Sequence, residues 1–304
     1  MPLFLEDFAT GMAFETPPRT IAEADVTNFA SLSGDFNPLH TDEDFARARR
    51  NQESGRVAIV TGGARGIGRA IAEKLAKNVK CRVVVADLDE EGKGVAKSVG
   101  GYFVLADLAK PEDCRTVVRK TLKRFGTLDI LVNNAGIQHI DPIENFPDEE
   151  WDRIMAVMLR APFILTKSVW PIMKAKGRGR IVNVASVHGL VASPSKSAYV
   201  AAKHGLLGLT KVAALEGGSV GITVNAVCPA YVRTDLVAGQ VRQQAKVHNI
   251  PEDEVLERVF LEKAAIRRLI EPEEVAAMVC YLCSEDASAI TGSAIPIDVG
   301  WMAK

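Results

Sequence analysis

The sequence predicts an α/β fold built on a doubly wound parallel sheet. From Arg56 onward, short β-branched runs alternate with amphipathic stretches that are long enough to form helices. The expected strands are apolar along their whole length, which is typical of strands that helices cover on both faces. A glycine-rich turn also separates the first strand from the first helix, as nucleotide-binding sheets require.

The expected elements follow one another in a regular alternation. Strands are expected at 56–62, 81–87, 102–107, 128–136, 179–186, 221–229 and 294–300. Helices between them include 66–78, 90–100 and 111–126, and the last of these begins with Pro and ends at Gly. Residues 235–265 are charged and helical in pattern, and a connection of this length is typical of an active-site lid.

Composition narrows the class of protein. The chain has 304 residues, 47% apolar and 25% charged, with a formal net charge of -1. These values are ordinary for a soluble globular protein and give no basis for nucleic-acid or membrane binding. The N-terminus lacks the basic start of a signal peptide, and five scattered cysteines fit a reducing compartment, so we expect a cytoplasmic protein. We interpret the lone CxxC of Cys280 and Cys283 as buried helix residues and expect no metal site.

A change in charge marks a boundary near residue 55. The first 55 residues hold ten acids, four arginines and no lysine, whereas basic residues outnumber acids in the rest of the chain. The polar, charged stretch `RARRNQESG` is a poor strand former. We therefore expect an N-terminal appendage with a linker at 1–55 and one large domain at 56–304.

The turn `TGGARGIG`, residues 61–68, is the first candidate site. Its glycines, Gly62, Gly66 and Gly68, permit a tight turn and bring the backbone close to a pyrophosphate, and the helix that follows offers free N–H groups. Asp87 ends the second strand, where an acid accepts hydrogen bonds from ribose hydroxyls and repels a 2′-phosphate. Arg65 favours a phosphate instead, but we give Asp87 more weight and predict NAD as the cofactor.

The second candidate site is a proton-transfer group. Tyr199 and Lys203 are four residues apart, so on a helix they share one face, and Ser186 ends the strand before them. Tyrosine has an ordinary pKa near 10. A neighbouring ammonium and a positively charged nicotinamide favour the phenolate, so we expect a lowered pKa and a role as general acid and base.

These motifs, with `NNAG` at 133–136, resemble those of the short-chain dehydrogenase/reductase family from about residue 55 to the end. The resemblance implies a Rossmann fold, with Tyr199 as the acid and base, Lys203 as the residue that lowers its pKa and binds the nicotinamide ribose, and Ser186 as the residue that orients the substrate. It also implies a homotetramer. Beyond the glycines and Asp87, we expect the cofactor to contact Ile67, Asp107, Leu108, Asn133, Ala135, Gly136, Val232 and Thr234.

Within the family, the stretches `NNAGIQHIDPIENFP` and `ASVHGLVASPSKSAYVAAKHG` resemble the 3-hydroxybutyrate dehydrogenases. This implies NAD-dependent oxidation of (R)-3-hydroxybutyrate to acetoacetate. The residues implied to bind this small 3-hydroxy acid are Gln138, His188, Lys196, Gln240 and Trp301. Three of them border Tyr199 by their place in the sequence, and a lysine with two amides can bind a carboxylate by charge-assisted hydrogen bonds.

Four positions depart from the family's pattern. Met158 stands where many members have a catalytic Asn, and a thioether cannot replace that amide in a proton relay. Ala230 and Val299 each replace a usual glycine, and Tyr231 stands where the subfamily often has Trp. These departures leave two alternatives open. One is a 3-ketoacyl thioester reductase, which would need basic residues at an open entrance and would usually prefer NADPH; the other is a binding protein on the same fold.

The N-terminal stretch `FASLSGDFNPLH` resembles the signature of the MaoC-like (R)-specific enoyl-CoA hydratases. That resemblance implies Asp35 and His40 as a pair that activates water, with Gly34 and Asn37 shaping the loop. It covers only about 50 residues, and the strands of the hot-dog sheet that should follow are missing. We therefore interpret 1–55 as an incomplete hot-dog fragment.

Overall fold

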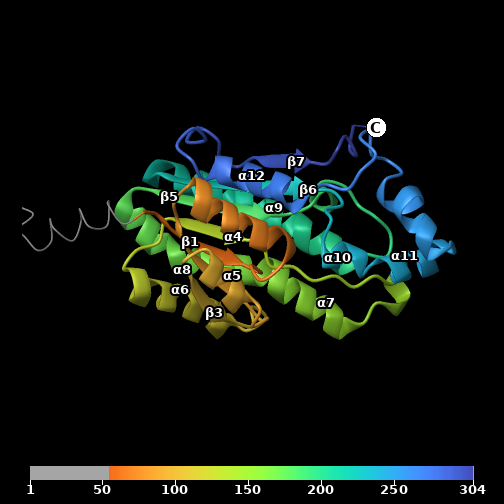
Figure 1. Cartoon of the computed structure of the whole chain (residues 1–304), viewed down its shortest axis with the longest axis horizontal. Coiled ribbons are helices and arrows are strands. Elements are labelled where there is room, and N and C mark those ends of the chain that lie inside the picture. Colours follow the sequence, from red (N-terminus) through yellow and green to blue (C-terminus); the bar gives the residue numbers. More distant parts are fainter. Residues whose placement is uncertain (1–54, 304) are drawn as a thin grey trace, which may run out of the picture. The chain divides into compact units, whose positions relative to one another are not determined.

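The computed structural model describes residues 55–303, so the hydratase-like segment lies outside the described residues. Seven strands form one parallel sheet in the order β3-β2-β1-β4-β5-β6-β7, which confirms the predicted doubly wound fold (Figure 1). The chain reverses its direction of winding between β1 and β4, and ligands bind at such points. The strands are β1 (Val57–Thr61), β2 (Arg82–Asp87), β3 (Tyr102–Leu105), β4 (Ile130–Asn133), β5 (Gly179–Val184), β6 (Ile222–Pro229) and β7 (Ala294–Ile297).

Helices cover both faces of the sheet. One core holds residues of α4 (Gly66–Asn78), α5 (Gly92–Ser98) and α12 (Pro272–Leu282), together with Ala58 and Val60 of β1. The residues of β1 that alternate with these two point to the opposite face of the sheet and belong to the second core. That second core holds residues of α6 (Pro111–Phe125), α8 (Ala161–Lys176) and α9 (Ser197–Gly217). Burial on both sides explains why the strands are mostly apolar, with a few buried polar residues such as Asn183 and Asn225 among them.

The remaining helices are short. Single 3₁₀ turns lie at Ile143–Asn145, Val187–Gly189 and Gly218–Val220. Within α12, Cys280 is buried, and Cys283, which caps the helix, is buried as well. The interpretation of the CxxC as buried helix residues is therefore confirmed.

A π-helical turn, Ala156–Arg160, joins α7 (Asp148–Met155) to α8. The Ala161 N–H bonds the Ala156 carbonyl five residues back, and Pro162 has no N–H for the Met158 carbonyl four residues back. Met158 itself is 1% exposed and packs against Ala198 and Ala202 of α9. The thioether thus serves as core packing where the family often has an amide.

The predicted lid region is helical in pieces rather than as one long helix. It contains α10 (Asp235–Ala238), α11 (Val241–His248), a 3₁₀ turn (Glu252–Glu254) and a π turn (Leu256–Phe260). Its own small core includes Ala245, Val255 and Phe260. A Pro and a left-handed Asn249 separate the pieces, because neither continues a helix easily.

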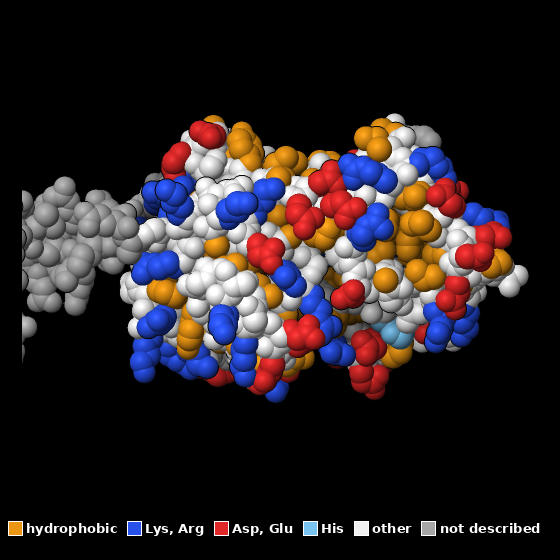
Figure 2. Space-filling view, viewed as in Figure 1, with side chains coloured by type: hydrophobic (Ala, Val, Ile, Leu, Met, Phe, Trp, Pro, Cys, Tyr) orange, Lys and Arg blue, Asp and Glu red, His pale blue; other side chains and the backbone are white. Residues whose placement is uncertain are grey.

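The described surface mixes charges of both signs. Figure 2 shows basic and acidic side chains interspersed over the face in view, in keeping with the small net charge. Among the described residues, no helix combines the length and the apolar character that crossing a membrane requires.

Val299 occupies an unusual backbone conformation. Its φ of 52° lies in the left-handed region, which a β-branched residue rarely adopts, and its carbonyl accepts bonds from the N–H groups of Ala265 and Ile266 at 3.0 Å. The usual glycine at this position would adopt that φ without strain. The C-terminal segment therefore joins the end of the lid region through a strained residue.

We expect Val299→Gly to be more stable than Val299→Ala, which reverses the usual order. Both variants lose the isopropyl group, but only glycine relieves the left-handed strain of about 1–2 kcal/mol, against a usual glycine cost of about 0.5–1 kcal/mol. Thermal unfolding of the two variants measures the difference. A glycine variant less stable than the alanine variant would contradict the strain.

Candidate active site

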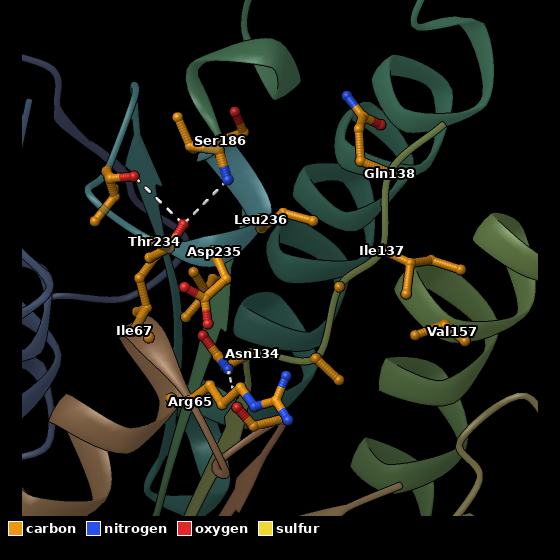
Figure 3. Close-up of a pocket in the computed structure, with 18 of the residues that line it drawn as sticks. Arg65, Ile67, Asn134, Ile137, Gln138, Val157, Ser186, Thr234, Asp235 and Leu236 are labelled. Atoms are coloured by element: carbon orange, nitrogen blue, oxygen red, sulfur yellow. Dashed lines mark hydrogen bonds between the residues drawn. The ribbon is translucent and has the colours of Figure 1, made fainter. Parts of the chain in front are cut away.

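A cavity of about 550 Å³ opens at the carboxyl ends of the central strands. Every residue predicted for the site lines it except Asn133 and Trp301. In Figure 3, Asn134, Ile137 and Gln138 follow one another along the loop after β4; Asn134 lies near Asp235, and Ile137 and Gln138 lie on the other side of the view from Thr234. One cavity thus brings together residues from six strand ends and from α9 and α10.

The glycine loop forms a cradle that side chains would fill. Gly66 begins α4 with a φ of +50°, and a Cβ on Gly68 would lie 2.0 Å from the Gly62 carbonyl oxygen. The first N–H groups of α4 have no partners within the helix, and its positive dipole end favours an anion. These features fit the pyrophosphate of a dinucleotide cofactor.

Asp87 lies at the predicted ribose end of the cavity. Its Oδ2 accepts the Ala64 N–H at 2.9 Å, and its Oδ1 accepts the Asp89 N–H at 3.0 Å, so the carboxylate is fixed in place. Arg65 is held by two other acids, because its guanidinium bonds Asp89 at 2.5 Å and Glu91 at 2.9 Å. The charge of Arg65 is thus already balanced within the loop.

The loop after β4 shows which asparagine faces the cavity. Asn134 lines the cavity, and its side-chain amide donates to the carbonyls of Thr61 and Gly62 at 2.9 and 3.0 Å. Asn133, which the sequence placed at the cofactor, is 3% exposed and donates instead to Asn183. The `NNAG` motif identifies this loop but does not show which of its two amides turns toward the glycines.

The proton-transfer group is assembled from β5 and α9. Ser186 follows β5 and is 5% exposed, and its hydroxyl donates to the Pro229 carbonyl at 3.3 Å. Lys203 is buried, and its ammonium donates to the carbonyl of Val184 at 2.7 Å. The same Nζ lies 5.6 Å from the centre of the Tyr199 ring, so the two side chains do share a face of the helix.

Burial raises the pKa of Tyr199 above its ordinary value, and a hydrogen bond with Ser186 opposes that rise. Burial also lowers the pKa of Lys203 to about 8. The pKa of this phenol is therefore raised where a lowered one was expected, because desolvation outweighs the hydrogen bond with Ser186. The positive charge of a bound oxidised nicotinamide would favour the phenolate.

Polar atoms without partners gather at the end of the cavity predicted to bind substrate. Among the described residues, Gln138 Oε1, His188 Nε2 and Gln240 Oε1 are buried and make no hydrogen bond. Such atoms cost stability unless a ligand satisfies them. Burial lowers the pKa of His188 to about 3, so its imidazole is neutral at pH 7.

Lys196 adds a buried cation to this polar end. It is 2% exposed, burial lowers its pKa to about 8, and no carboxylate pairs with it among the described residues. Trp301 lies behind His188, with ring centres 5.8 Å apart, and packs with Val187 and Leu261. Trp301 thus supports the wall of the cavity without lining it.

The sequence identified Tyr231 only as a departure from the family's pattern. In the structure it lines the cavity, and its hydroxyl lies 3.2 Å from the Lys196 Nζ. Spacing along the chain could not show this, because 35 residues separate the two.

The sheet, the glycine cradle and the Ser186–Tyr199–Lys203 group define an oxidoreductase that uses a nicotinamide cofactor. The profile described as enoyl-(acyl carrier protein) reductase matches residues 62–302. The chain belongs to the short-chain dehydrogenase/reductase family.

Several relatives are similar over nearly their whole length. A D-beta-hydroxybutyrate dehydrogenase of Rhizobium meliloti is 46% identical over 82% of this chain and 99% of its own. An acetoacetyl-CoA reductase of the same organism is 39% identical over 81% of this chain and 98% of its own. Among solved structures, a variant of actinorhodin polyketide ketoreductase with NADPH superposes with a TM-score of 0.78 at 34% identity, covering 81% of this chain and 97% of its own.

A second profile, described as a MaoC like domain, matches residues 7–86. This confirms the resemblance of the N-terminal region, and the match extends beyond the 50 residues expected from the sequence. Within the described residues, the part of this match from Val57 onward forms β1, α4 and most of β2 of the parallel sheet.

We expect Gly68→Ala to impair both cofactor binding and stability. The new methyl would press on the Gly62 carbonyl, and overpacking of this kind costs about 1–3 kcal/mol. Thermal unfolding and the fluorescence of bound NADH measure the two effects.

Gly94→Ala is the matched control. No atom lies within 4 Å of a Cβ at Gly94, which lies in α5, so alanine there should leave binding unchanged. Equal losses in the two variants would show that the cradle is not tight.

Proposed function

We propose that the protein oxidises (R)-3-hydroxybutyrate to acetoacetate with NAD. One observation carries this proposal: within residues 55–303, a buried ammonium without a counter-charge and three unpaired polar atoms lie at the same end of the cavity as Tyr199. A small anion would balance the ammonium and can accept a bond from His188 Nε2, whereas the two glutamine Oε1 atoms are acceptors and need a donor. The 46% identity to a D-beta-hydroxybutyrate dehydrogenase supports the same substrate.

In the proposed mechanism, the hydroxyl of the substrate lies between Ser186 and Tyr199, and the carboxylate faces Lys196. Tyr199 removes the hydroxyl proton, and Ser186 holds the oxygen on which charge develops. The bound nicotinamide supplies the oxidant. Lys203 keeps a positive charge beside the phenol and lies at the bottom of the cavity, where it can bind the cofactor's ribose.

The choice of NAD rests on Asp87 and on the loop around it. The fixed carboxylate of Asp87 can accept bonds from ribose hydroxyls and repels a 2′-phosphate. Arg65, the residue that would favour NADP, is occupied by Asp89 and Glu91. The negative charge of this region therefore supports NAD, although the ketoreductase of similar fold was solved with NADPH.

A 3-ketoacyl thioester reductase is the second candidate, because acetoacetyl-CoA reductases are also similar to the chain. A thioester has no carboxylate to meet the buried Lys196, so the site favours the free acid. Rates of NAD-linked oxidation of the free acid and of its CoA thioester separate the two candidates.

We expect Tyr199→Phe to lower kcat by at least about 100-fold, which is the usual contribution of a general base. NADH binding should remain, because the ring and Lys203 stay in place. Steady-state kinetics and NADH fluorescence measure the two effects. Tyr281→Phe, on the half-exposed face of α12, should change neither, and an active Tyr199→Phe variant would refute the assignment.

Anion binding should weaken above pH 8. The pKa of Lys196 is about 8, so its ammonium loses a proton as the pH rises through that value. The Ki of acetate, measured as a competitive inhibitor of the hydroxy acid, should then rise about tenfold per pH unit.

Lys196→Gln separates this effect from the titration of Lys203. The amide can still donate a hydrogen bond but has no charge, so acetate should bind it weakly at every pH. If the variant kept the pH dependence of the wild type, Lys196 would not be the anion-binding group.

The cofactor preference should shift in Asp87→Asn combined with Glu91→Gln. The first change removes the charge that repels a 2′-phosphate, and the second releases the Arg65 Nε to meet it. We expect kcat/KM for NADP to rise by about tenfold, or about 1.4 kcal/mol, with a loss for NAD. A wild-type preference for NADP would contradict the proposed role of Asp87.

A further inference from the structure

Tyr231 is fixed on two sides of its ring. Its hydroxyl lies 3.2 Å from the Lys196 Nζ, and the same Nζ lies 5.2 Å from the centre of the ring. Phe260 of the lid region stacks on the ring, with centres 4.5 Å apart and planes 26° from parallel. Because Lys196 is 2% exposed, this contact lies inside the protein and not at its surface.

Counting protons shows that the Tyr231 hydroxyl has one left to donate. An ammonium has three donors and no acceptor, so Lys196 must donate to the Tyr231 oxygen. The hydroxyl proton of Tyr231 then points elsewhere, and no acceptor for it occurs among the residues that the structure describes. Burial raises the pKa of Tyr231, so the hydroxyl keeps this proton throughout the neutral range.

We propose that Tyr231 and Lys196 form a two-donor clamp for the substrate's carboxylate, in which the ammonium binds one oxygen and the Tyr231 hydroxyl the other. Both residues line the cavity, and neither donor has another anionic partner among the described residues. A carboxylate accepts two such bonds at once, and charge-assisted bonds are strong. This inference rests on the proposed function for the nature of the anion.

The clamp also connects the substrate to the lid region. Tyr231 packs with Val237, Val241 and Phe260, all of which belong to that region. A carboxylate bound to the hydroxyl therefore holds a ring that the lid covers. Tyr231 stands where the subfamily often has Trp. The single N–H of an indole would lie in a different place, so the hydroxyl gives this position a different donor for an anion.

Tyr231→Phe tests the hydroxyl alone, because phenylalanine keeps the ring and its stacking on Phe260. We expect the KM for 3-hydroxybutyrate and the Ki for acetate to rise together by about 10- to 100-fold, as for the loss of a bond to a charged group. The kcat and the KM for NAD should change by less than about threefold. Changes below twofold in both KM and Ki would overturn the clamp, and so would a rise in KM with an unchanged Ki for acetate.

Phe260→Leu is the matched control, because it removes the stacking and keeps the hydroxyl. Acetate should inhibit this variant nearly as well as the wild type. If the Ki of acetate rose equally in both variants, the effect would come from the packing of the lid region and the clamp would be wrong. This conclusion would hold even if Tyr231→Phe were less stable than the wild type.

A measurement without turnover separates this inference from the proposed function. With NAD present, acetate should raise the Tm of the wild type and raise that of Tyr231→Phe much less. A wild type that does not oxidise 3-hydroxybutyrate but shows this difference would refute the substrate and retain the clamp. A protein that oxidises it and shows equal shifts in both forms would retain the substrate and refute the clamp.

Discussion

The bond from the Lys203 ammonium to the Val184 carbonyl is the interaction on which the site's geometry depends. Val184 is the last residue of β5, so this bond holds α9 against the carboxyl end of the strand. Tyr199 lies one turn earlier on α9, and Ser186 lies two residues beyond the strand. The bond therefore places the side chains of Tyr199 and Ser186 next to each other. A buried ammonium with one carbonyl partner is costly, and the lowered pKa of Lys203 reflects that cost.

Much of the fold and part of the site could be predicted because local patterns determine them. The predicted helix at 66–78 has the bounds of α4, since the glycine turn fixes its start. The spacing of Tyr199 and Lys203 on one helix was also sufficient to place them on one face. The contact between Lys196 and Tyr231 was not predictable, because it joins residues far apart in the sequence. The pKa of Tyr199 depends on burial, which no spacing reveals.

The buried polar groups at one end of the cavity lower the stability of the protein and are available to bind a ligand. Each buried atom without a partner, such as Gln138 Oε1 or Gln240 Oε1, costs about 1–3 kcal/mol in the protein without ligand. Lys196 pays a similar desolvation cost, which its lowered pKa records. An anionic ligand recovers the cost of the buried Lys196 ammonium, and a donor group recovers that of an amide oxygen, whereas an apolar ligand recovers neither. The buried ammonium therefore selects against ligands that lack a negative charge.

The C-terminal segment extends this constraint to the lid region. Trp301 packs behind His188, and the Val299 carbonyl bonds the N–H groups of Ala265 and Ile266 where the lid region ends. Trp301, Leu261 and Ala264 share one small core with Val187, which adjoins Ser186 in the chain. A shift of the lid would disturb the packing that supports the His188 ring. His188 lines the cavity, so the packing of the lid region and the orientation of this imidazole depend on the same contacts.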